Sequence, residues 1–264
     1  MRGSVRPAGG WPPRARVAVL GALRVQRVDG SPVDPRDFRT AKTRHLLRLL
    51  ALADGAPVAV EQLVDTLWPS VADQRGRASL RTAASQLRHT MHYDHVRRWG
   101  DTLQLVDVSV DVHRFAAYSR CARAAAAQGD LEEALSAGMK ALAEYGGDLA
   151  ADEPFLDPLL DAQRTWSAHR RELLLSTASA ACTLGRAELT RELAEQALLE
   201  DATCERAARL VMRTYTHLGE PGGAIRCYEH LRSRLAEEFS IAPSLATQAL
   251  YQRLVSGPVG LATP

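Results

Sequence analysis

The sequence predicts a mainly α-helical chain, in which an N-terminal domain with a small β-sheet is followed by an all-α domain. Short strand-like runs occur before residue 40 and again between residues 96 and 106. Apolar residues recur at helical spacing from residue 40 to about residue 91, and again from residue 115 onward. A length of 264 residues is enough for two domains, each with a core of its own.

The N-terminal domain is expected over residues 16–112, after a tail over residues 1–15 whose Gly and Pro content predicts disorder. Strands are predicted at Val17–Gly21 and Leu23–Val28, and Asp29-Gly30-Ser31-Pro32 supplies the next turn. Three helices and a hairpin follow, at Ala41–Asp54, Val60–Trp68, Arg77–Met91 and Val96–Val106. Strands, three helices and a hairpin are the order of a winged helix-turn-helix domain, with the hairpin as its wing.

The C-terminal domain, expected over residues 113–256 before a flexible tail at 257–264, shows internal similarity. Leu184-Gly185 and Leu218-Gly219 lie 34 residues apart, and Gly129-Asp130 opens a similar helix. Small or apolar residues recur five and twelve positions after each glycine, at Ala134, Thr190 and Ala224, and at Ala141, Ala197 and Leu231. A period of 34 residues is typical of tetratricopeptide repeats, although a generic helical bundle can show a similar pattern.

Charge is divided unequally between the two halves of the chain. Residues 1–112 hold 17 Lys and Arg against 11 Asp and Glu, a net charge of +6, whereas residues 113–264 hold 16 against 20, a net charge of −4. A basic N-terminal half favours a polyanionic partner such as DNA, although a solvated basic surface gives the same count. No apolar run approaches the roughly 20 residues that cross a bilayer, and no secretory signal precedes Arg16, so we expect a cytoplasmic protein.

The third predicted helix carries most of the functional argument. Leu80, Ala84, Leu87 and Met91 share one face and should pack on the core, whereas the opposite face is polar and short-chained. No acidic residue lies between Gln74 and Tyr93, which suits a helix in the major groove because a carboxylate would repel the phosphates. Contacts to base edges are expected from Arg81, Thr82, Ser85, Gln86, Arg88 and His89. Contacts to phosphates are expected from Lys42, Arg44, Arg75, Arg77, Arg97 and Arg98. A solvated basic helix is the alternative.

No motif indicates catalysis or a cofactor. The sequence has no phosphate-binding loop of the Gly-x-x-x-x-Gly-Lys-Ser/Thr type and no nucleophile motif, so we expect neither an enzyme nor a bound cofactor. His89, His92 and His95 fall at three-residue steps, and a metal site there is the alternative to a DNA-facing role for His89. The four cysteines are far apart, without metal-ligand spacing, and are expected as small buried residues.

Several motifs are similar to those of one family of bacterial regulators. The runs Thr40-Ala41-Lys42-Thr43-Arg44-His45-Leu46-Leu47 and Val60-Glu61-Gln62-Leu63-Val64-Asp65-Thr66-Leu67-Trp68-Pro69 resemble the first two helices of the Streptomyces antibiotic regulatory protein family. Ser85-Gln86-Leu87-Arg88 resembles the Ser-Arg-Leu-Arg of its recognition helix. The stretch from Tyr228 to Phe239, with Pro243 and Ala249-Leu250-Tyr251, is similar to the closing helices of its activation domain. The resemblance covers about residues 17–255.

The resemblance implies an OmpR/PhoB-type winged helix followed by a bacterial transcriptional activation domain of tetratricopeptide-like helices. It implies an activator that binds direct heptameric repeats as a dimer beside the −35 promoter element. Such an activator recruits RNA polymerase, including its sigma factor, to genes of antibiotic or other secondary-metabolite biosynthesis. A helical-repeat adaptor whose winged helix does not bind DNA is the alternative.

Three positions depart from the family pattern. Ala59 stands where a polar N-cap is usual before the second helix, which removes a cap worth about 1 kcal/mol. Asp101 stands in the wing where tyrosine is usual, which places a carboxylate near DNA and puts the wing contacts in doubt. Tyr145 replaces a tryptophan and is expected in the core.

Overall fold

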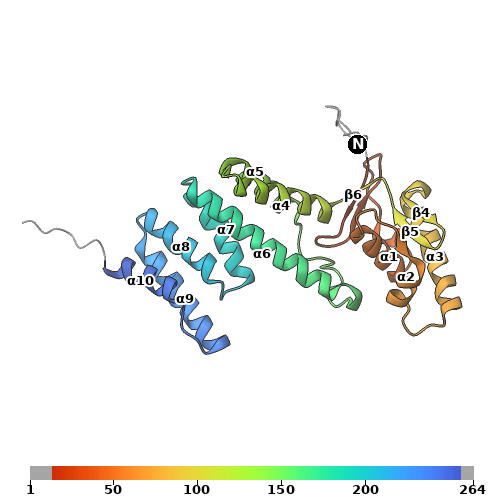
Figure 1. Ribbon diagram of the computed structural model, residues 1–264. Helices are drawn as coiled ribbons and strands as arrows, with labels where there is room; N and C mark the ends of the chain where they lie inside the picture. The colour runs from red at the N-terminus through yellow and green to blue at the C-terminus, as the bar shows by residue number, and fades with distance from the viewer. Residues whose placement is uncertain (1–13, 257–264) are drawn as a thin grey trace, which may run out of the picture. The chain divides into compact units, whose positions relative to one another are not determined.

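The computed structural model describes residues 14–256, which fold into two compact units (Figure 1). Residues 14–115 and 144–164 form the first unit, and residues 116–143 and 165–256 form the second. The tails expected over residues 1–15 and 257–264 fall outside the described residues, apart from residues 14 and 15, and the first strand already begins at Ala15. Helices predominate in both units, and the predicted mainly α class is confirmed.

The first unit contains a three-stranded sheet of β1 (Ala15–Ala18), β2 (Arg24–Gln26) and β6 (Val108–Val110), in the order β2-β1-β6. β1 pairs antiparallel with β2 and parallel with β6. The buried carboxylate of Asp111, directly after β6, accepts hydrogen bonds from the backbone N–H of Val19 at 3.0 Å and of Leu20 at 2.9 Å. Asp111 thereby satisfies buried donors at the end of β1 and links the end of β6 to the end of its parallel neighbour.

A second sheet forms the wing. It contains β3 (Val58–Ala59), β4 (Val96–Trp99) and β5 (Thr102–Leu105), in the order β3-β5-β4, and both pairings are antiparallel. β4 and β5 are joined by the turn at Gly100-Asp101, as the sequence predicts. Leu103 and Leu105 are buried, so one face of the hairpin packs on the helices.

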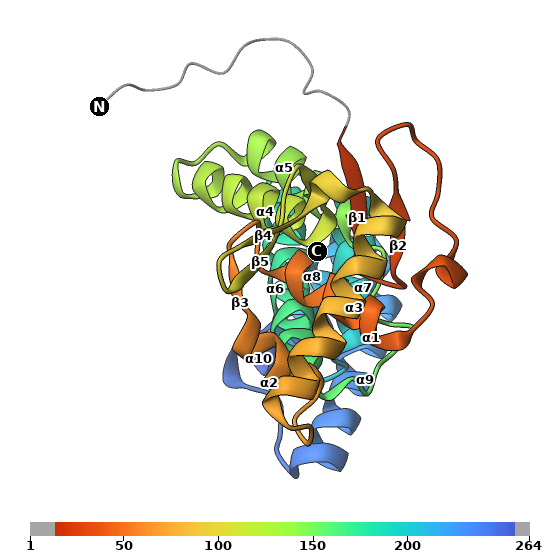
Figure 2. The same ribbon diagram turned by 90° about the vertical axis from the view of Figure 1, so that its right-hand side faces the viewer.

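Three helices of the first unit pack on one another: α1 (Ala41–Leu52), which precedes β3 in the sequence, and α2 (Val60–Leu67) and α3 (Asp73–Met91), which lie between β3 and β4. Figure 2 shows α1 beside α3. α1 has a cap in Thr40, whose hydroxyl accepts from the N–H of Thr43 at 3.2 Å, whereas Ala59 provides α2 with no side-chain cap. Strands, three helices and a hairpin confirm the winged helix-turn-helix arrangement.

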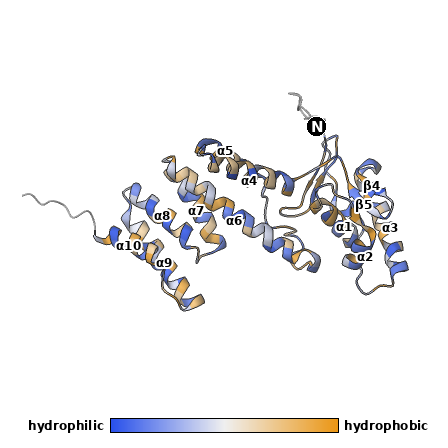
Figure 3. Ribbon diagram, in the orientation of Figure 1, coloured by the Kyte–Doolittle hydropathy of each residue, from blue (hydrophilic) through white to orange (hydrophobic). Residues whose placement is uncertain are grey.

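The second unit is helical, and its helices follow one another as antiparallel neighbours: α4 (Asp111–Ala127), α5 (Leu131–Glu144), α6 (Leu160–Thr183), α7 (Ala187–Glu200), α8 (Glu205–His217), α9 (Pro221–Phe239) and α10 (Leu245–Ser256). α4 and α6 begin within the first unit, and α5 ends there. All six repeat positions named from the sequence are buried. Figure 3 shows that the helices carry hydrophobic and hydrophilic residues in alternation, as expected when one side of each faces a neighbour.

The turn between paired helices is the same in three places. Gly129, Gly185 and Gly219 adopt φ of +79°, +71° and +74°, a conformation that glycine reaches without strain. In each turn the residue after the glycine donates its N–H to a carbonyl five residues earlier: Ala125, Ala181 or Tyr215. This repeated geometry is that of tetratricopeptide-like helix hairpins and explains the predicted internal similarity.

Three sequence expectations are changed. α3 begins at Asp73, four residues before the predicted start, and β3 and β6 were not expected. Cys121 is exposed and the other three cysteines are half-buried, so the expectation of small buried cysteines is wrong for Cys121. Among the residues the structure describes, no helix is both long and apolar enough to cross a membrane.

Candidate nucleic-acid interface

Helix α3 is held in place by its apolar face. Leu80, Ala84, Leu87 and Met91 are all buried, as predicted. A Cβ at Gly76 would lie 2.5 Å from Cγ1 of Val64, so the glycine allows α3 to approach α2 closely. These contacts determine which side of α3 faces outward, away from α2 and the core.

The opposite face of α3 is exposed, and its residues are uncharged or basic. Ala78, Thr82, Ser85 and His89 are exposed in a row, with Arg81 beside them. Thr82 donates its hydroxyl to the carbonyl of Ala78 at 3.2 Å within the helix. This surface, which we call the reading face, has the composition expected of a helix that meets base edges.

Gln86, a predicted base contact, lies on the outer face of α3 but is half-buried. Its side-chain oxygen accepts from the hydroxyl of Thr43 at 2.8 Å, which fixes α3 to α1. The amide nitrogen of Gln86 forms no hydrogen bond with a described residue, so it keeps two donors for another partner.

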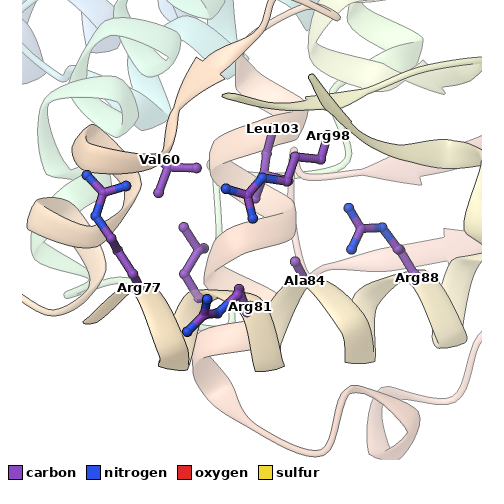
Figure 4. A pocket seen from close by; sticks show the side chains of 8 residues that line it. Val60, Arg77, Arg81, Ala84, Arg88, Arg98 and Leu103 are labelled. Atoms are coloured by element: carbon purple, nitrogen blue, oxygen red, sulfur yellow. The ribbon is translucent and has the colours of Figure 1, made fainter. Parts of the chain in front are cut away.

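An arginine-lined cavity of about 300 Å³ lies between α3 and the wing (Figure 4). We call it the arginine cavity; it is lined by Val60, Arg77, Leu80, Arg81, Ala84, Arg88, Arg98 and Leu103. Figure 4 shows the guanidinium groups of Arg77, Arg88 and Arg98 facing the space between the helix and the strands. Four arginines around an apolar floor attract an anion strongly, because low-polarity walls weaken the screening of charge.

Two carboxylates border this cavity. Asp73 contacts Nε of Arg77 at 3.0 Å, and Asp101 contacts Nη1 of Arg77 at 3.0 Å and Nη2 of Arg98 at 3.4 Å. The hydrogen bonds that Arg77 donates to Asp101, and then those that it donates to Asp73, raise the pKa of Arg77 above its ordinary value. Arg81 forms no hydrogen bond or ion pair with any described residue.

The remaining predicted contacts divide into engaged and free side chains. Arg88 donates Nε to the carbonyl of Val96 at 2.8 Å, which attaches α3 to β4. Arg44 donates to Glu153 at 3.1 Å, and Arg97 donates to the carbonyl of Asp94 at 3.3 Å. Lys42 and Arg75 are exposed and form no ion pair with a described residue. The structure therefore brings Arg77, Arg81, Arg88 and Arg98 together and holds Arg44 apart from them.

The histidines at three-residue steps do not converge. His89 and His92 are exposed, whereas His95 is buried and its Nδ1 lies 3.1 Å from the carbonyl oxygen of Val106. Among the described residues, no group of three or more His, Cys, Asp or Glu side chains is arranged to hold a metal ion.

Trp99 is a surface feature that sequence reasoning missed. It lies at the end of β4, next to the turn of the wing, and its side chain is 85% exposed. Its exposure could have been predicted from the sequence. An aromatic residue beside a two-residue hairpin turn has little protein to pack against.

Comparison with known proteins places the helical region in a family. Residues 110–255, more than half of the chain, match the family described as bacterial transcriptional activator domain. The chain belongs to this family. The match covers α4 to α10, the helices that carry the repeated glycine turns.

Similarity to individual relatives covers the winged helix as well as the activator domain. The chain is 26% identical over 262 residues to the transcriptional regulatory protein EmbR of Mycobacterium tuberculosis, covering 92% of this chain and 63% of EmbR. It is 27% identical over 261 residues to the regulatory protein AfsR of Streptomyces griseus, covering 94% of this chain and 25% of AfsR. The chain thus spans less than two thirds of EmbR and a quarter of AfsR.

A solved structure supports the fold. The structure of Mycobacterium tuberculosis EmbR in complex with a low-affinity phosphopeptide aligns with a TM-score of 0.76 at 24% identity, over 92% of this chain and 65% of EmbR. At this identity the likeness concerns the fold, a winged helix followed by tetratricopeptide-like helices.

Proposed function

We propose that this chain is a sequence-specific DNA-binding activator of transcription in the bacterial cytoplasm. The observation that carries the proposal is the reading face, an exposed and acid-free helix surface directly beside the arginine cavity. Polar side chains on such a helix can select bases, and the flanking arginines can hold the phosphates that fix its register. The names of EmbR and AfsR, both regulatory proteins, agree with this role.

Base contacts are assigned to the exposed members of the predicted set, Arg81, Thr82, Ser85 and His89, and to the free amide of Gln86. Phosphate contacts are assigned to Lys42, Arg75, Arg77, Arg97 and Arg98. We give Arg44 a supporting role, because its guanidinium group already bonds Glu153. Arg88 bonds the carbonyl of Val96 through Nε alone and lines the arginine cavity, so we assign its terminal nitrogens to a phosphate contact.

The finer proposal concerns partners. The chain binds direct repeats near a −35 element as a homodimer and recruits RNA polymerase holoenzyme, including its sigma factor, with the helical unit taking part. The target genes belong to secondary-metabolite biosynthesis. This assignment rests on the resemblance to the Streptomyces antibiotic regulatory proteins.

A footprint on the promoters beside the chain's own gene, with and without RNA polymerase, tests the proposal. The variant Ser85→Glu places a carboxylate on the reading face, and we expect it to lose the footprint through a drop in affinity of at least about tenfold. Ala126→Glu, at an exposed position of α4, is the matched control and should bind like the wild type.

Two results would contradict parts of the proposal. If Ser85→Glu and Ala126→Glu give the same footprint, α3 is not the reading helix. If the wild type shows no salt-dependent affinity for DNA, the adaptor alternative replaces the activator, since binding to phosphates necessarily weakens as salt rises.

A further inference from the structure

The arginine cavity lies between the two elements that a winged helix brings to DNA. Its lining comes from α3 on one side and from α2, β4 and β5 on the other (Figure 4). The inference rests on the proposed function, in which α3 enters a major groove and the wing approaches the next minor groove. One sugar-phosphate backbone separates neighbouring grooves, so that backbone must pass along this cavity.

The cavity is built for an anion with several oxygens. Arg77, Arg88 and Arg98 turn their guanidinium groups toward it, and Arg81 adds a fourth arginine to its lining. Arg88 is held by its Nε on the carbonyl of Val96, which leaves its two terminal nitrogens without a hydrogen bond to any described residue. Guanidinium groups bind phosphate and carboxylate oxygens in the same planar manner, often through two parallel hydrogen bonds.

Asp101 is not itself part of the lining of the cavity, but its carboxylate contacts two of the arginines that are. It bridges two of the arginines, with Arg77 Nη1 at 3.0 Å and Arg98 Nη2 at 3.4 Å, and its side chain is 60% exposed. The backbone carbonyl of Asp101 accepts separately from the N–H of Val60 at 2.9 Å, so the turn has an anchor that does not depend on the carboxylate. Asp101 therefore behaves as a counter-ion whose carboxylate can leave the arginines without releasing the turn.

We propose that the arginine cavity is a binding site for one DNA backbone phosphate and that Asp101 is the counter-ion which this phosphate displaces. Phosphate entry breaks the contacts of Asp101 with Arg77 and Arg98 and replaces them with contacts to phosphate oxygens. In the wild-type chain, the loss of the Asp101 contacts therefore offsets part of the free energy gained when the phosphate binds. Removing that carboxylate makes DNA binding tighter.

The test compares two variants that each remove one negative charge from the first unit. Asp101→Asn removes the counter-ion, and Asp65→Asn is the matched control, because Asp65 of α2 is exposed, forms no ion pair with a described residue and lies outside the lining of the cavity. The probe is a fluorescent mixed-sequence DNA duplex, since phosphate contacts do not depend on sequence. Affinities of the full chain are measured over a range of salt concentrations.

We expect Asp101→Asn to bind the duplex about three- to tenfold more tightly than Asp65→Asn at low salt, with a difference that shrinks as salt rises. In an Arg77→Gln/Arg98→Gln background this advantage should vanish, because the carboxylate then has no partner to release. Equal affinities of the two single variants, or weaker binding by Asp101→Asn than by the wild type, would overturn the inference while leaving the DNA-binding function intact. Absence of salt-dependent binding by the wild type would overturn both.

Discussion

Arg48 shows how a single residue links distant parts of the first unit. Its side chain is completely buried, although it lies on α1 among leucines. Nη2 lies 2.6 Å from the carboxylate of Asp152, and Nη1 lies 3.1 Å from Oε1 of Glu153. His45, one turn earlier on α1, also bonds Glu153. A buried guanidinium is tolerated only with such partners, so residues 152 and 153 are required by a helix 100 positions away in the sequence.

The titration of His45 follows from this cluster. Burial is the main cause that lowers the pKa of His45, and the nearby charges of Arg48 and Lys42 add to it, against the contact with Glu153. Its Nδ1 is buried without a hydrogen-bond partner, so a second proton there would have no acceptor. Burial alone would raise the pKa of Glu153, but the bonds with His45 and Arg48 outweigh it and lower the pKa.

Both shifts predict lower stability in acid. Because the pKa of His45 is lower in the folded state than its value of 6.5 in the unfolded state, the folded state binds this proton less readily. The unfolding free energy is therefore unaffected by the titration of His45 above pH 6.5 and decreases as pH falls below that value. Glu153 acts in the same direction below its ordinary value of 4.5. We expect the unfolding free energy to fall between pH 7 and pH 5, with the His45 contribution at most about 1.4 kcal/mol per pH unit. His45→Gln should reduce this slope in urea denaturation.

His92→Gln is the control for that measurement, because His92 is exposed and its change should leave the slope as in the wild type. An unchanged slope in His45→Gln would show that the acid sensitivity arises elsewhere.

At the scale of elements, helix pairs depend on positions where no side chain fits. Gly138 of α5 faces Thr177 of α6, and a Cβ at Gly138 would lie 2.4 Å from the Thr177 hydroxyl oxygen. The same relation holds between Gly223 of α9 and the ring of Tyr215 on α8. Close approach of paired helices is therefore set by single glycines in addition to the repeated turns.

We expect Gly138→Ala to lower the unfolding free energy by about 1–3 kcal/mol, because the added methyl group must push α5 and α6 apart. Thr177→Ala removes the clashing atoms, so the double variant should be more stable than the sum of the single changes predicts. Gly222→Ala on α9 is the matched control; its new methyl group would lie no closer than 3.5 Å to another residue. It should be neutral or stabilising, as helix propensity favours alanine. Equal losses for positions 138 and 222 would contradict this explanation.

Elements with strong local patterns were predictable, and those fixed by distant contacts were not. The buried and exposed faces of α3 followed from the spacing of Leu80, Leu87 and Met91, because apolar residues that recur at the helical period lie on one side and pack on the core. β3 and β6 have two and three residues, too few to show a pattern. α3 began earlier than expected because Ala72 provides no capping signal.

The candidate site was predictable to a similar extent. The exposed row on α3 was found, because periodicity decides which side faces outward. The partners of Arg44 and Arg88 were not, since Glu153 lies 109 residues from Arg44 and the carbonyl of Val96 has no side-chain signature. The sequence showed that Asp101 replaces the tyrosine usual in the family, but only the structure shows that its carboxylate bridges Arg77 and Arg98.

On the scale of the whole molecule, the first unit is assembled from two stretches of chain. The N–H of Gly21 donates to the carbonyl of Asp148 at 2.9 Å, and that of Ala150 donates to the carbonyl of Val19 at 2.9 Å. Leu20 and Leu149 are both fully buried at this junction. The matched family region begins at residue 110, so a segment of the activator domain completes the winged-helix unit. The predicted domain boundary at residue 112 stays a proposal. The first compact unit also contains residues 144–164, which follow that boundary in the sequence.

A pair of fragments tests this assembly. The first fragment carries residues 14–115, and the second carries residues 14–115 joined to residues 144–164 by a short Gly-Ser linker. A short linker suffices, because Arg114 lies 2.7 Å from Glu144 and the rings of Phe115 and Tyr145 are 5.5 Å apart. The first fragment leaves the buried guanidinium of Arg48 without carboxylates, a loss of about 3–5 kcal/mol, and exposes Leu20. We therefore expect cooperative urea unfolding, and a dispersed amide spectrum, from the second fragment and not from the first. Equal unfolding free energies for the two fragments would show that residues 144–164 merely lie on a winged helix that is already complete.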